Sequence, residues 1–285
     1  MAGVTPQGTP FYELVLVSGK GLGLFAAQNI PRGTRILEES PLVHLKSKDS
    51  EQKLTRLVDQ LTHLSPEQAN AFDDLYHDPR RYNKRLLARF RKHALDALGK
   101  VTNRYLAESM MEIETAQTVK RIAIFHTNCV RLGETGEYGT GLFPLFSRLN
   151  HSCNANVYHS YNPTIGKETV HAVRQINKGE ELVTSYIHTA WRTKEQRDDH
   201  LQEGWDFSCK CKACEGRKAA KSEERRERMF EIDQALALYE KGLRWVPGLS
   251  GFKIPLSVQQ ALVLAEEMLD LLREEGIVDL QLAQV

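Results

Sequence analysis

The sequence has neither a long apolar run nor an excess of charge of one sign. No stretch of its 285 residues approaches the roughly 20 apolar residues that cross a bilayer, and the opening MAGVTPQGTP has no basic segment followed by an apolar one. We therefore expect no membrane association and a cytoplasmic or nuclear location. The net charge of +1 at pH 7 gives no overall attraction to nucleic acid and leaves local contact with it open.

Cysteine is scarce and unevenly placed. The chain has five cysteines, and residues 45–125 contain none of them. So few thiols exclude a disulfide framework, and the crowding of three of them favours metal ligation in a reducing compartment. The five are Cys129, Cys153, Cys209, Cys211 and Cys214.

The CKCKAC segment, residues 209–214, predicts most of a zinc site. Tetrahedral zinc takes four ligands, so the fourth must come from another part of the chain. Cys153 is the first candidate, with His151 and Cys129 as alternatives. The two lysines of the segment would offset the negative charge of four thiolates. The other interpretation is three free thiols on an exposed loop, which would be chemically reactive unless something binds them.

Strand patterns lie on both sides of a helical stretch. Residues 11–45 and 126–190 carry short alternating runs and turns, as in FYELVLV and ETVHAVRQI. Residues 50–125 have helical periodicity, and one helix is predicted to begin with Ser65 as its cap and Pro66 at the first helical position. This order predicts one α+β domain that is split in sequence.

Glycines punctuate the first strand region. We expect Gly19, Gly21 and Gly23, in SGKGLGL, to break this region into short strands. The spacing is not G-x-G-x-x-G, and no helix follows it, so it is weak support for a ligand site. A hairpin turn and a ligand contact are equally open for each glycine.

The end of the chain, residues 217–285, predicts two amphipathic helices. The second has a capping box from Ser257 to Gln260 and ends at Gly276. Such helices are not stable alone, so we expect them to pair and to dock on the main domain. Their apolar faces are Met229, Ile232, Leu236, Tyr239 and Leu243 in the first helix, and Ala261, Leu264, Met268 and Leu271 in the second.

Three motifs, in this order, resemble those of the SET-domain protein-lysine methyltransferases, and of their SMYD branch in particular: RLNHSCNANV, GEELVTSYI and CKCKAC. Two further stretches resemble the family's N-terminal strands and the segment that leads into its core: GKGLGLFAAQNIPRGTRILEE and GTGLFPLFSRLNHSC. The resemblance covers residues 18–45 and 126–215. It implies an α+β SET domain, with small β-sheets around a knot-like core, a helical insertion, a post-SET zinc site and a C-terminal helical pair.

The resemblance divides the chain into five expected segments. Two halves of the SET domain enclose the insertion, and the zinc segment precedes the last helices. These segments are 11–45 (first half), 46–125 (insertion), 126–190 (second half), 191–216 (post-SET zinc segment) and 217–285 (C-terminal helices). The SMYD branch normally carries a MYND-type zinc finger in this insertion, which has no cysteine here. Ala155 stands where the family usually has a proline.

The activity that the resemblance implies is transfer of a methyl group from S-adenosylmethionine (AdoMet) to a lysine of a protein substrate, either a histone or another protein. Such a transfer is an in-line displacement, so much of its acceleration comes from positioning the two reactants and excluding water. The alternative is a catalytically inactive SET-like module, stabilised by zinc, that binds other proteins. A DNA-binding zinc protein is disfavoured, because the zinc segment carries no long recognition helix.

The site residues follow from the same resemblance. Tyr186 takes the place of the catalytic tyrosine, and its ordinary pKa near 10 suits an orienting group better than a base. In the family, the cysteine of the Asn-His-Ser-Cys stretch completes the structural zinc site, which implies the ligands Cys153, Cys209, Cys211 and Cys214. The implied AdoMet contacts are Lys20, Leu22, Asn128, Ser147, Leu149, Asn150, His151, Tyr186, Trp205 and Phe207.

Simpler structural roles stay open for several of these residues. Tyr186 would otherwise cap the core at the end of a strand, and His151 would be a buried histidine bonded to a carbonyl. Asn128 would be a turn residue. Trp205 and Phe207 would pack the zinc loop onto the domain.

One basic stretch suggests a partner. RRYNKRLLARFRKH places seven Lys or Arg within residues 80–92. A solvated helix face is the simpler interpretation. Contact with an acidic protein or with nucleic acid is the alternative.

Overall fold

The structure is a computed structural model that describes residues 10–46, 53–82, 84–85, 87–88, 90, 92, 104–187, 192–244 and 253–277. Its first sheet joins strands from both halves of the predicted domain. The strands, in spatial order, are β1 (Tyr12–Val17), β2 (Gly21–Ala26), β10 (Glu181–Thr184) and β7 (Asn150–His151). In this sheet β10 is antiparallel to β2 and parallel to β7, so Asn150 and His151 lie beside β10.

The glycine-rich segment corrects one prediction. Gly19 lies in the turn between β1 and β2 with a positive φ of 74°, as a chain reversal requires. Gly21 and Gly23, however, do not break the chain into separate strands. Both lie within β2, where they pair with Val17 and Val15 of β1.

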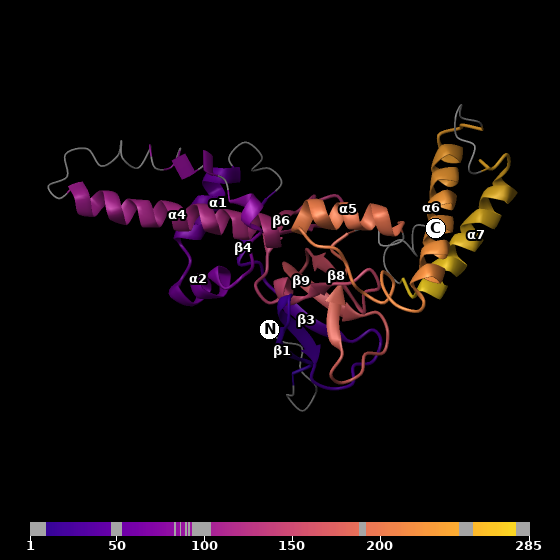
Figure 1. The fold of residues 1–285 in the computed structure, drawn as a ribbon, viewed down its shortest axis with the longest axis horizontal. Helices are drawn as coiled ribbons and strands as arrows, with labels where there is room; N and C mark the ends of the chain where they lie inside the picture. Colours follow the sequence, from indigo (N-terminus) through magenta and orange to yellow (C-terminus); the bar gives the residue numbers. More distant parts are fainter. Residues whose placement is uncertain are drawn as a thin grey trace.

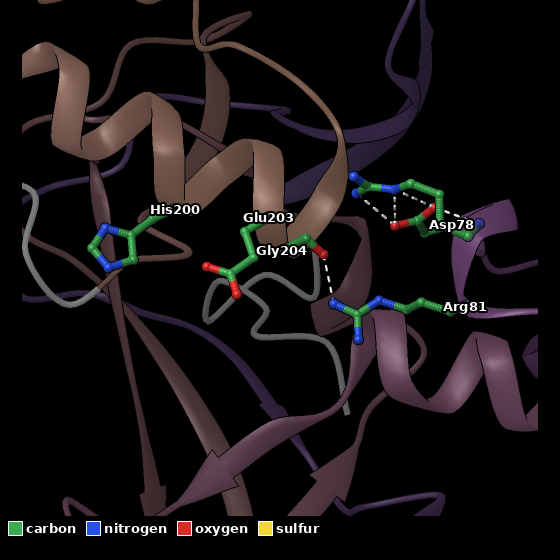
Figure 2. A pocket seen from close by; sticks show the side chains of 6 residues that line it. Asp78, Arg81, His200, Glu203 and Gly204 are labelled. Atoms are coloured by element: carbon green, nitrogen blue, oxygen red, sulfur yellow. Dashed lines mark hydrogen bonds and ion pairs between the residues drawn. The ribbon is translucent and has the colours of Figure 1, made fainter.

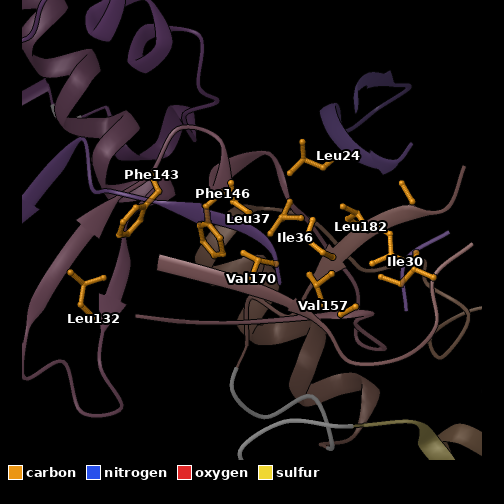
Figure 3. Packing of buried hydrophobic residues seen from close by; sticks show 14 residues of the cluster. Leu24, Ile30, Ile36, Leu37, Leu132, Phe143, Phe146, Val157, Val170 and Leu182 are labelled. Atoms are coloured by element: carbon orange, nitrogen blue, oxygen red, sulfur yellow. The ribbon is translucent and has the colours of Figure 1, made fainter. Parts of the chain in front are cut away.

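Two three-stranded sheets complete the β-structure. Their strands are β3 (Arg35–Glu39), β9 (Lys167–Ala172) and β8 (Val157–Asn162) in one, and β4 (Val43–Leu45), β6 (Gly139–Leu142) and β5 (Val130–Leu132) in the other. A short 3-10 helix, η3 (Phe146–Arg148), leads into β7. Side chains from the first two sheets, among them Leu24, Leu37, Val170 and Leu182, meet in one buried apolar core (Figure 3).

The helical insertion contains α1 (Lys53–Thr62), α2 (Pro66–Asp73), η2 (Pro79–Arg81) and α4 (Arg104–Asn128). The predicted start of α2 is confirmed. Ser65 Oγ accepts a hydrogen bond from the N–H of Gln68, and the Gln68 side chain accepts one from the N–H of Ser65. The last of these helices runs to Asn128, so it extends slightly beyond the predicted helical region and ends at the site described below.

The C-terminal region contains α5 (Lys194–Trp205), α6 (Ala219–Glu240) and α7 (Val258–Glu275). The predicted pairing of the last two helices is confirmed, because Met229 and Ile232 of α6 are buried against Met268 and Leu272 of α7. Leu243 is a correction, since it lies beyond the end of α6 and is exposed. Among the described helices, none combines the length and apolarity that a membrane crossing requires.

Both ends of α7 lie where the sequence predicts them. Ser257 Oγ accepts a hydrogen bond from the N–H of Gln260, and Gly276 adopts the left-handed conformation that closes the helix. The return bond of the capping box is displaced by one residue, because the Gln260 side chain accepts from Leu256 rather than from Ser257.

Figure 1 shows how these parts are arranged. The sheets lie in the middle of the molecule. The long helix α4 extends away on one side, and the α6–α7 pair stands on the other. The helix α5 crosses between them, next to the sheets.

Candidate functional site

A cavity of about 1820 Å³ opens between the first sheet, the C-terminal end of α4 and the segment that follows α5. It is lined by residues from distant parts of the chain. These include every residue for which an AdoMet contact is predicted: Lys20, Leu22, Asn128, Ser147, Leu149, Asn150, His151, Tyr186, Trp205 and Phe207.

A carboxylate joins two of these residues. Glu181 Oε1 accepts a hydrogen bond from Asn150 Nδ2 at 2.8 Å, and Glu181 Oε2 lies 3.2 Å from Lys20 Nζ. Glu181 is the first residue of β10, and Asn150 is the first residue of β7. The parallel pairing sets Asn150 opposite Val183, two residues along β10 from Glu181, and so keeps the two side chains within reach of each other.

His151 is buried and connects Tyr186 to the cysteines. Its Nδ1 accepts a hydrogen bond from the backbone N–H of Tyr186 at 3.0 Å, and its Nε2 lies 3.4 Å from Cys153 Sγ. Because an amide N–H only donates, Nδ1 carries no proton, and the proton of the neutral ring lies on Nε2 and points to the sulfur. Burial lowers the pKa of His151 to about 4, so the ring stays neutral at physiological pH. It bonds to an amide and a thiol, not to the carbonyl considered above.

Tyr186 lies two residues beyond the end of β10, which corrects its predicted place as the last residue of that strand. Its hydroxyl donates a hydrogen bond to the carbonyl of Leu149 at 2.8 Å. Its ring centroid is 5.0 Å from that of Trp205 and 6.4 Å from that of Phe207. Burial, assisted by the charge of Glu181, raises the pKa of Tyr186 well above its ordinary value. The hydroxyl is therefore neutral at any physiological pH.

The end of α4 forms another wall of the cavity. Asn128 donates two hydrogen bonds through Nδ2, to the carbonyls of Tyr76 at 2.7 Å and Ile124 at 2.8 Å. It is the last helical residue rather than a turn residue. Both bonds use the amide nitrogen, so the amide group is held in one orientation at the cavity wall.

Four thiols gather behind His151. The sulfur atoms of Cys153, Cys209, Cys211 and Cys214 all lie within 4.8 Å of one another. Two of these separations are 3.5 Å (Cys153 to Cys214) and 3.8 Å (Cys211 to Cys214). Four thiolates at the usual Zn–S distance of about 2.3 Å would be about 3.8 Å apart, so the group fits a tetrahedral metal ion. Hydrogen bonds from the other three thiols, from Cys153 first, hold the pKa of Cys211 well below its ordinary value.

Neither alternative fourth ligand fits as well. The Nδ1 atom of His151 is taken by the amide of Tyr186, and its Nε2 carries a proton. Cys129 packs against the apolar cluster of the helical insertion, and burial raises the pKa of its thiol to about 11. Cys129 is also not among the four thiols whose sulfur atoms lie within 4.8 Å of one another.

Two fully buried arginines flank the thiols. Arg197 Nη2 lies 3.5 Å from Cys214 Sγ, and Arg226 Nη2 donates to the carbonyl of Cys153 at 3.2 Å. Each has an exposed fraction of 0%. A buried guanidinium needs a negative partner, and the ion-pair partner of Arg197, Glu223, is as far as 3.8 Å away. A cluster of four thiolates around Zn²⁺, with a net charge of about −2, supplies that partner.

This arrangement corrects the source of the charge balance. Lys210 and Lys212 were expected to offset the thiolates, but both side chains are exposed. The exposed lysines interact weakly through solvent. Arg197 takes that role, because its Nη2 lies 3.5 Å from Cys214 Sγ, whereas Arg226 pairs with Glu275 at 3.0 Å.

The helical insertion holds the segment that closes the cavity. Arg81 Nη2 donates to the carbonyl of Gly204 at 2.6 Å, as Figure 2 shows beside a second, open cavity of about 520 Å³. Trp205 Nε1 donates to the carbonyl of Thr127 at 3.2 Å, and Arg80 pairs with Asp206 at 3.3 Å. Trp205 therefore both lines the cavity and fastens α5 to α4. Of the basic stretch 80–92, residues 83, 86, 89 and 91 lie outside the described part of the chain.

Sequence reasoning missed three residues of this site. Glu181 stands in a motif that was used, GEELVTSYI, but no role was given to its carboxylate. Arg197 and Arg226 lie in the charged runs KEQRDDH and EERRERM, where nothing separates a buried arginine from its exposed neighbours. Their partners are far away in the chain, and no local pattern reports them.

The family model of the SET domain matches residues 21–187, which is more than half of the chain. The chain belongs to the SET-domain family. This match begins at β2 and ends directly after Tyr186, so it contains β2, β7 and β10 of the first sheet and the insertion, and it leaves out β1.

Two kinds of curated relatives are similar to this chain. The histone-lysine N-methyltransferase set5 of Schizosaccharomyces pombe is 32% identical over 237 residues, which are 82% of this chain and 60% of that protein. The N-lysine methyltransferase SMYD2 of Homo sapiens is 40% identical over 81 residues, which are 28% of this chain and 18% of that protein. The chain thus spans about 60% of the length of set5, and its match to SMYD2 is shorter still.

Among solved structures, the SET domain of LSMT bound to lysine and AdoHcy has a TM-score of 0.44 and 12% sequence identity. The alignment covers 96% of this chain and 73% of that one. At this level the similarity adds nothing to the family assignment, which stands on the sequence.

Proposed function

We propose that this protein transfers methyl groups from AdoMet to lysine side chains of a protein substrate. The observation that carries the proposal is one cavity, to which five separate segments bring the ten predicted contact residues, among them Tyr186 with its hydroxyl. Membership of the SET-domain family supports it. So do the names of the relatives, a histone-lysine and an N-lysine methyltransferase.

The role proposed for Tyr186 follows from its hydrogen bond. Bound AdoMet supplies a methyl group on a positively charged sulfur. The Tyr186 hydroxyl gives its one proton to the carbonyl of Leu149, so it offers oxygen lone pairs to the cavity. A lone pair accepts a hydrogen bond from the substrate amine and orients it for in-line attack. Because its pKa is raised, the hydroxyl acts neither as a base nor as an anion.

The role proposed for Zn²⁺ is structural. Cys153, Cys209, Cys211 and Cys214 would fill all four positions of a tetrahedral ion, which leaves none for substrate. The bound ion would fix Cys153, and with it the ring of His151 that bonds to the backbone of Tyr186. The metal would thereby position the tyrosine without contacting it.

The segment division expected from the sequence is retained as part of the proposal. Residues 11–45 and 126–190 are the two halves of the SET domain, 46–125 is the insertion, 191–216 is the post-SET zinc segment and 217–285 holds the C-terminal helices. The proposed substrate is a histone or another protein, met in the nucleus or the cytoplasm. The name of the set5 relative favours a histone as the first substrate to test.

The decisive experiment uses Tyr186→Phe, which removes one oxygen and keeps the ring. The protein is incubated with methyl-labelled AdoMet and either core histones or a cell extract, and labelled bands are identified. We expect the variant to methylate on the order of ten- to a thousandfold more slowly. AdoMet affinity and thermal stability should stay close to those of the parent.

Two results would contradict this. A variant that methylates at the parental rate removes Tyr186 from catalysis. A parent protein that binds AdoMet and never labels any protein supports instead the inactive module that binds other proteins.

A further inference from the structure

One charged side chain in the cavity has no role in the chemistry described so far. Glu181 is only 19% exposed and lies between Lys20, at 3.2 Å, and Asn150, at 2.8 Å. Removing most of the water around a carboxylate costs free energy unless the carboxylate is paired with another group. Its two partners both belong to the predicted AdoMet contacts.

The adjacent strand leaves space for this group. A Cβ atom added at Gly23 of β2 would lie 3.0 Å from Asn150 Nδ2 and 3.2 Å from Glu181 Oε1. The φ angle of Gly23 is not in the left-handed region, so its backbone does not demand glycine. The requirement is close approach: the amide and the carboxylate need room beside the bare backbone of β2.

The hydrogen bond also sets which atom of Asn150 is presented. Its Nδ2 is held by Glu181, so its Oδ1 is turned away from the carboxylate and remains an acceptor. Lys20 is 49% exposed, and a pair between partly exposed groups is weak enough to open for a ligand. This part of the cavity wall thus offers the Glu181 carboxylate and Asn150 Oδ1 to a cationic group, and the Lys20 ammonium to an anionic one.

From this geometry we infer that Glu181 binds the ammonium group of a zwitterionic α-amino acid end on a nucleoside ligand and positions Asn150 for the same contact, while Lys20 takes the carboxylate. The inference rests on the proposed function, since AdoMet is a ligand of that class. In the ligand-free protein, Lys20 and Glu181 satisfy each other. The ligand zwitterion replaces that pair with two complementary ones, so little net charge is desolvated on binding.

The test compares two ligands on one variant. Glu181→Gln keeps the size of the side chain and an oxygen that can accept from Asn150, and it removes the charge. Calorimetry is run with S-adenosylhomocysteine and with 5′-methylthioadenosine, which has the same nucleoside and lacks the amino acid end. We expect the variant to bind S-adenosylhomocysteine about 10- to 100-fold more weakly and methylthioadenosine unchanged.

A matched control is available in another sheet. Glu38 is 20% exposed and pairs with Lys167 at 2.7 Å, away from the cavity. Glu38→Gln therefore removes a similar lysine–glutamate pair, and it should leave both affinities unchanged. Lys20→Met is the second test, because Lys20 is exposed enough that folding does not depend on it. It should also weaken S-adenosylhomocysteine alone.

The outcomes separate this inference from the proposed function. If the parent protein binds neither S-adenosylhomocysteine nor AdoMet, the proposed function fails and this inference with it. If the parent binds and both Glu181→Gln and Lys20→Met bind equally well, the inference is overturned and the function stands. If Glu181→Gln weakens both ligands by the same factor, Glu181 only supports the fold, and the inference is also overturned.

Discussion

The helical insertion and the zinc end of the molecule are held together by different interactions. In the insertion, α1, α2 and α4 bury one apolar cluster, with an ion pair at its edge in which Arg121 contacts both oxygens of Asp73, at 2.8 and 2.7 Å. At the zinc end the polar groups that gather are four thiols, three of them buried, together with buried His151 and two buried arginines. The members of the apolar cluster are Val43, Leu45, Leu57, Leu61, Phe72, Leu75, Ile122, Ile124, Phe125 and Leu142.

The difference determines how each region responds to loss of one group. Apolar packing is a sum of many small contributions, so a single change weakens it in proportion to the area lost. Buried charges are stable only while their partners remain, so removal of one partner leaves the others uncompensated. We therefore expect graded effects in the insertion and abrupt ones at the zinc end.

The largest effect should follow loss of a thiolate. Cys153→Ser is expected to release zinc and to unfold the zinc segment, because a structural zinc site contributes on the order of 10 kcal/mol to a small domain. Metal content, measured by mass spectrometry, should fall from about one zinc per chain to a small fraction of that, as with Cys211→Ser.

Cys129→Ser is the control for this change, since Cys129 lies in the insertion cluster. It should keep its full zinc and lose only a little stability. A Cys153→Ser protein with full zinc would show that the fourth ligand is another group.

A smaller loss of stability is expected at the C-terminal end of α7, where Glu275 is the last helical residue. Glu275 is buried and accepts hydrogen bonds from Arg226, Arg225 and Ser222, and its own carbonyl accepts one from Asn154. Glu275→Gln removes the charge that compensates Arg226, and breaking a buried pair typically costs about 3 to 5 kcal/mol. Urea unfolding should report this loss.

The neighbouring residue gives a matched control. Glu274 is 65% exposed and lies 4.0 Å from Arg225. Glu274→Gln should change the free energy of unfolding by less than about 0.5 kcal/mol. Equal effects of the two substitutions would mean that the buried network does not join the helices to the zinc end.

The smallest effect concerns the ion pair of the insertion and depends on pH. The hydrogen bonds from Arg121 lower the pKa of Asp73 below its ordinary value. A lowered pKa in the folded state stabilises the fold above the ordinary pKa, and that contribution is lost as the pH falls through the folded value. Asp73→Asn should therefore cost about 1 kcal/mol at pH 7.

The pH dependence supplies the check on this prediction. Unfolding of Asp73→Asn and of the parent is compared at pH 7 and near pH 3, where the difference should shrink. Asp74→Asn, a change at an exposed neighbour, is the control and should cost less than Asp73→Asn at pH 7. A difference that stays constant with pH would mean that packing, and not charge, is what the substitution removes.

The contrast between the two regions also explains what could be predicted from the sequence. The start of α2 at Ser65 and the end of α7 at Gly276 were predicted correctly, because both depend on groups a few residues apart. The ten residues that line the cavity were named from the family resemblance, which carries long-range information that local patterns lack. Glu181, Arg197 and Arg226 were missed, since their partners are distant in the chain.

The glycine error has a related cause. Gly21 and Gly23 were predicted to break the chain because glycine weakens an isolated strand. In β2 the strand is held by β1 on one side and by β10 on the other. Besides Val17 of β1, the side chains that approach Gly23 come from β7 and β10, which no local window of sequence contains.

The pairing of β2 with β10 also has a consequence for synthesis of the chain. Leu24 pairs with Leu182, so the first sheet closes only after nearly all of the SET domain has left the ribosome. Until then the edge of β2 that later pairs with β10 is unpaired, and the β1–β2 hairpin carries apolar side chains such as Leu14 and Leu16, which are exposed even in the folded protein. A nascent hairpin of this kind can pair with other chains. We therefore expect a chaperone to be needed most before β10 emerges, while this unpaired edge and these apolar side chains are exposed.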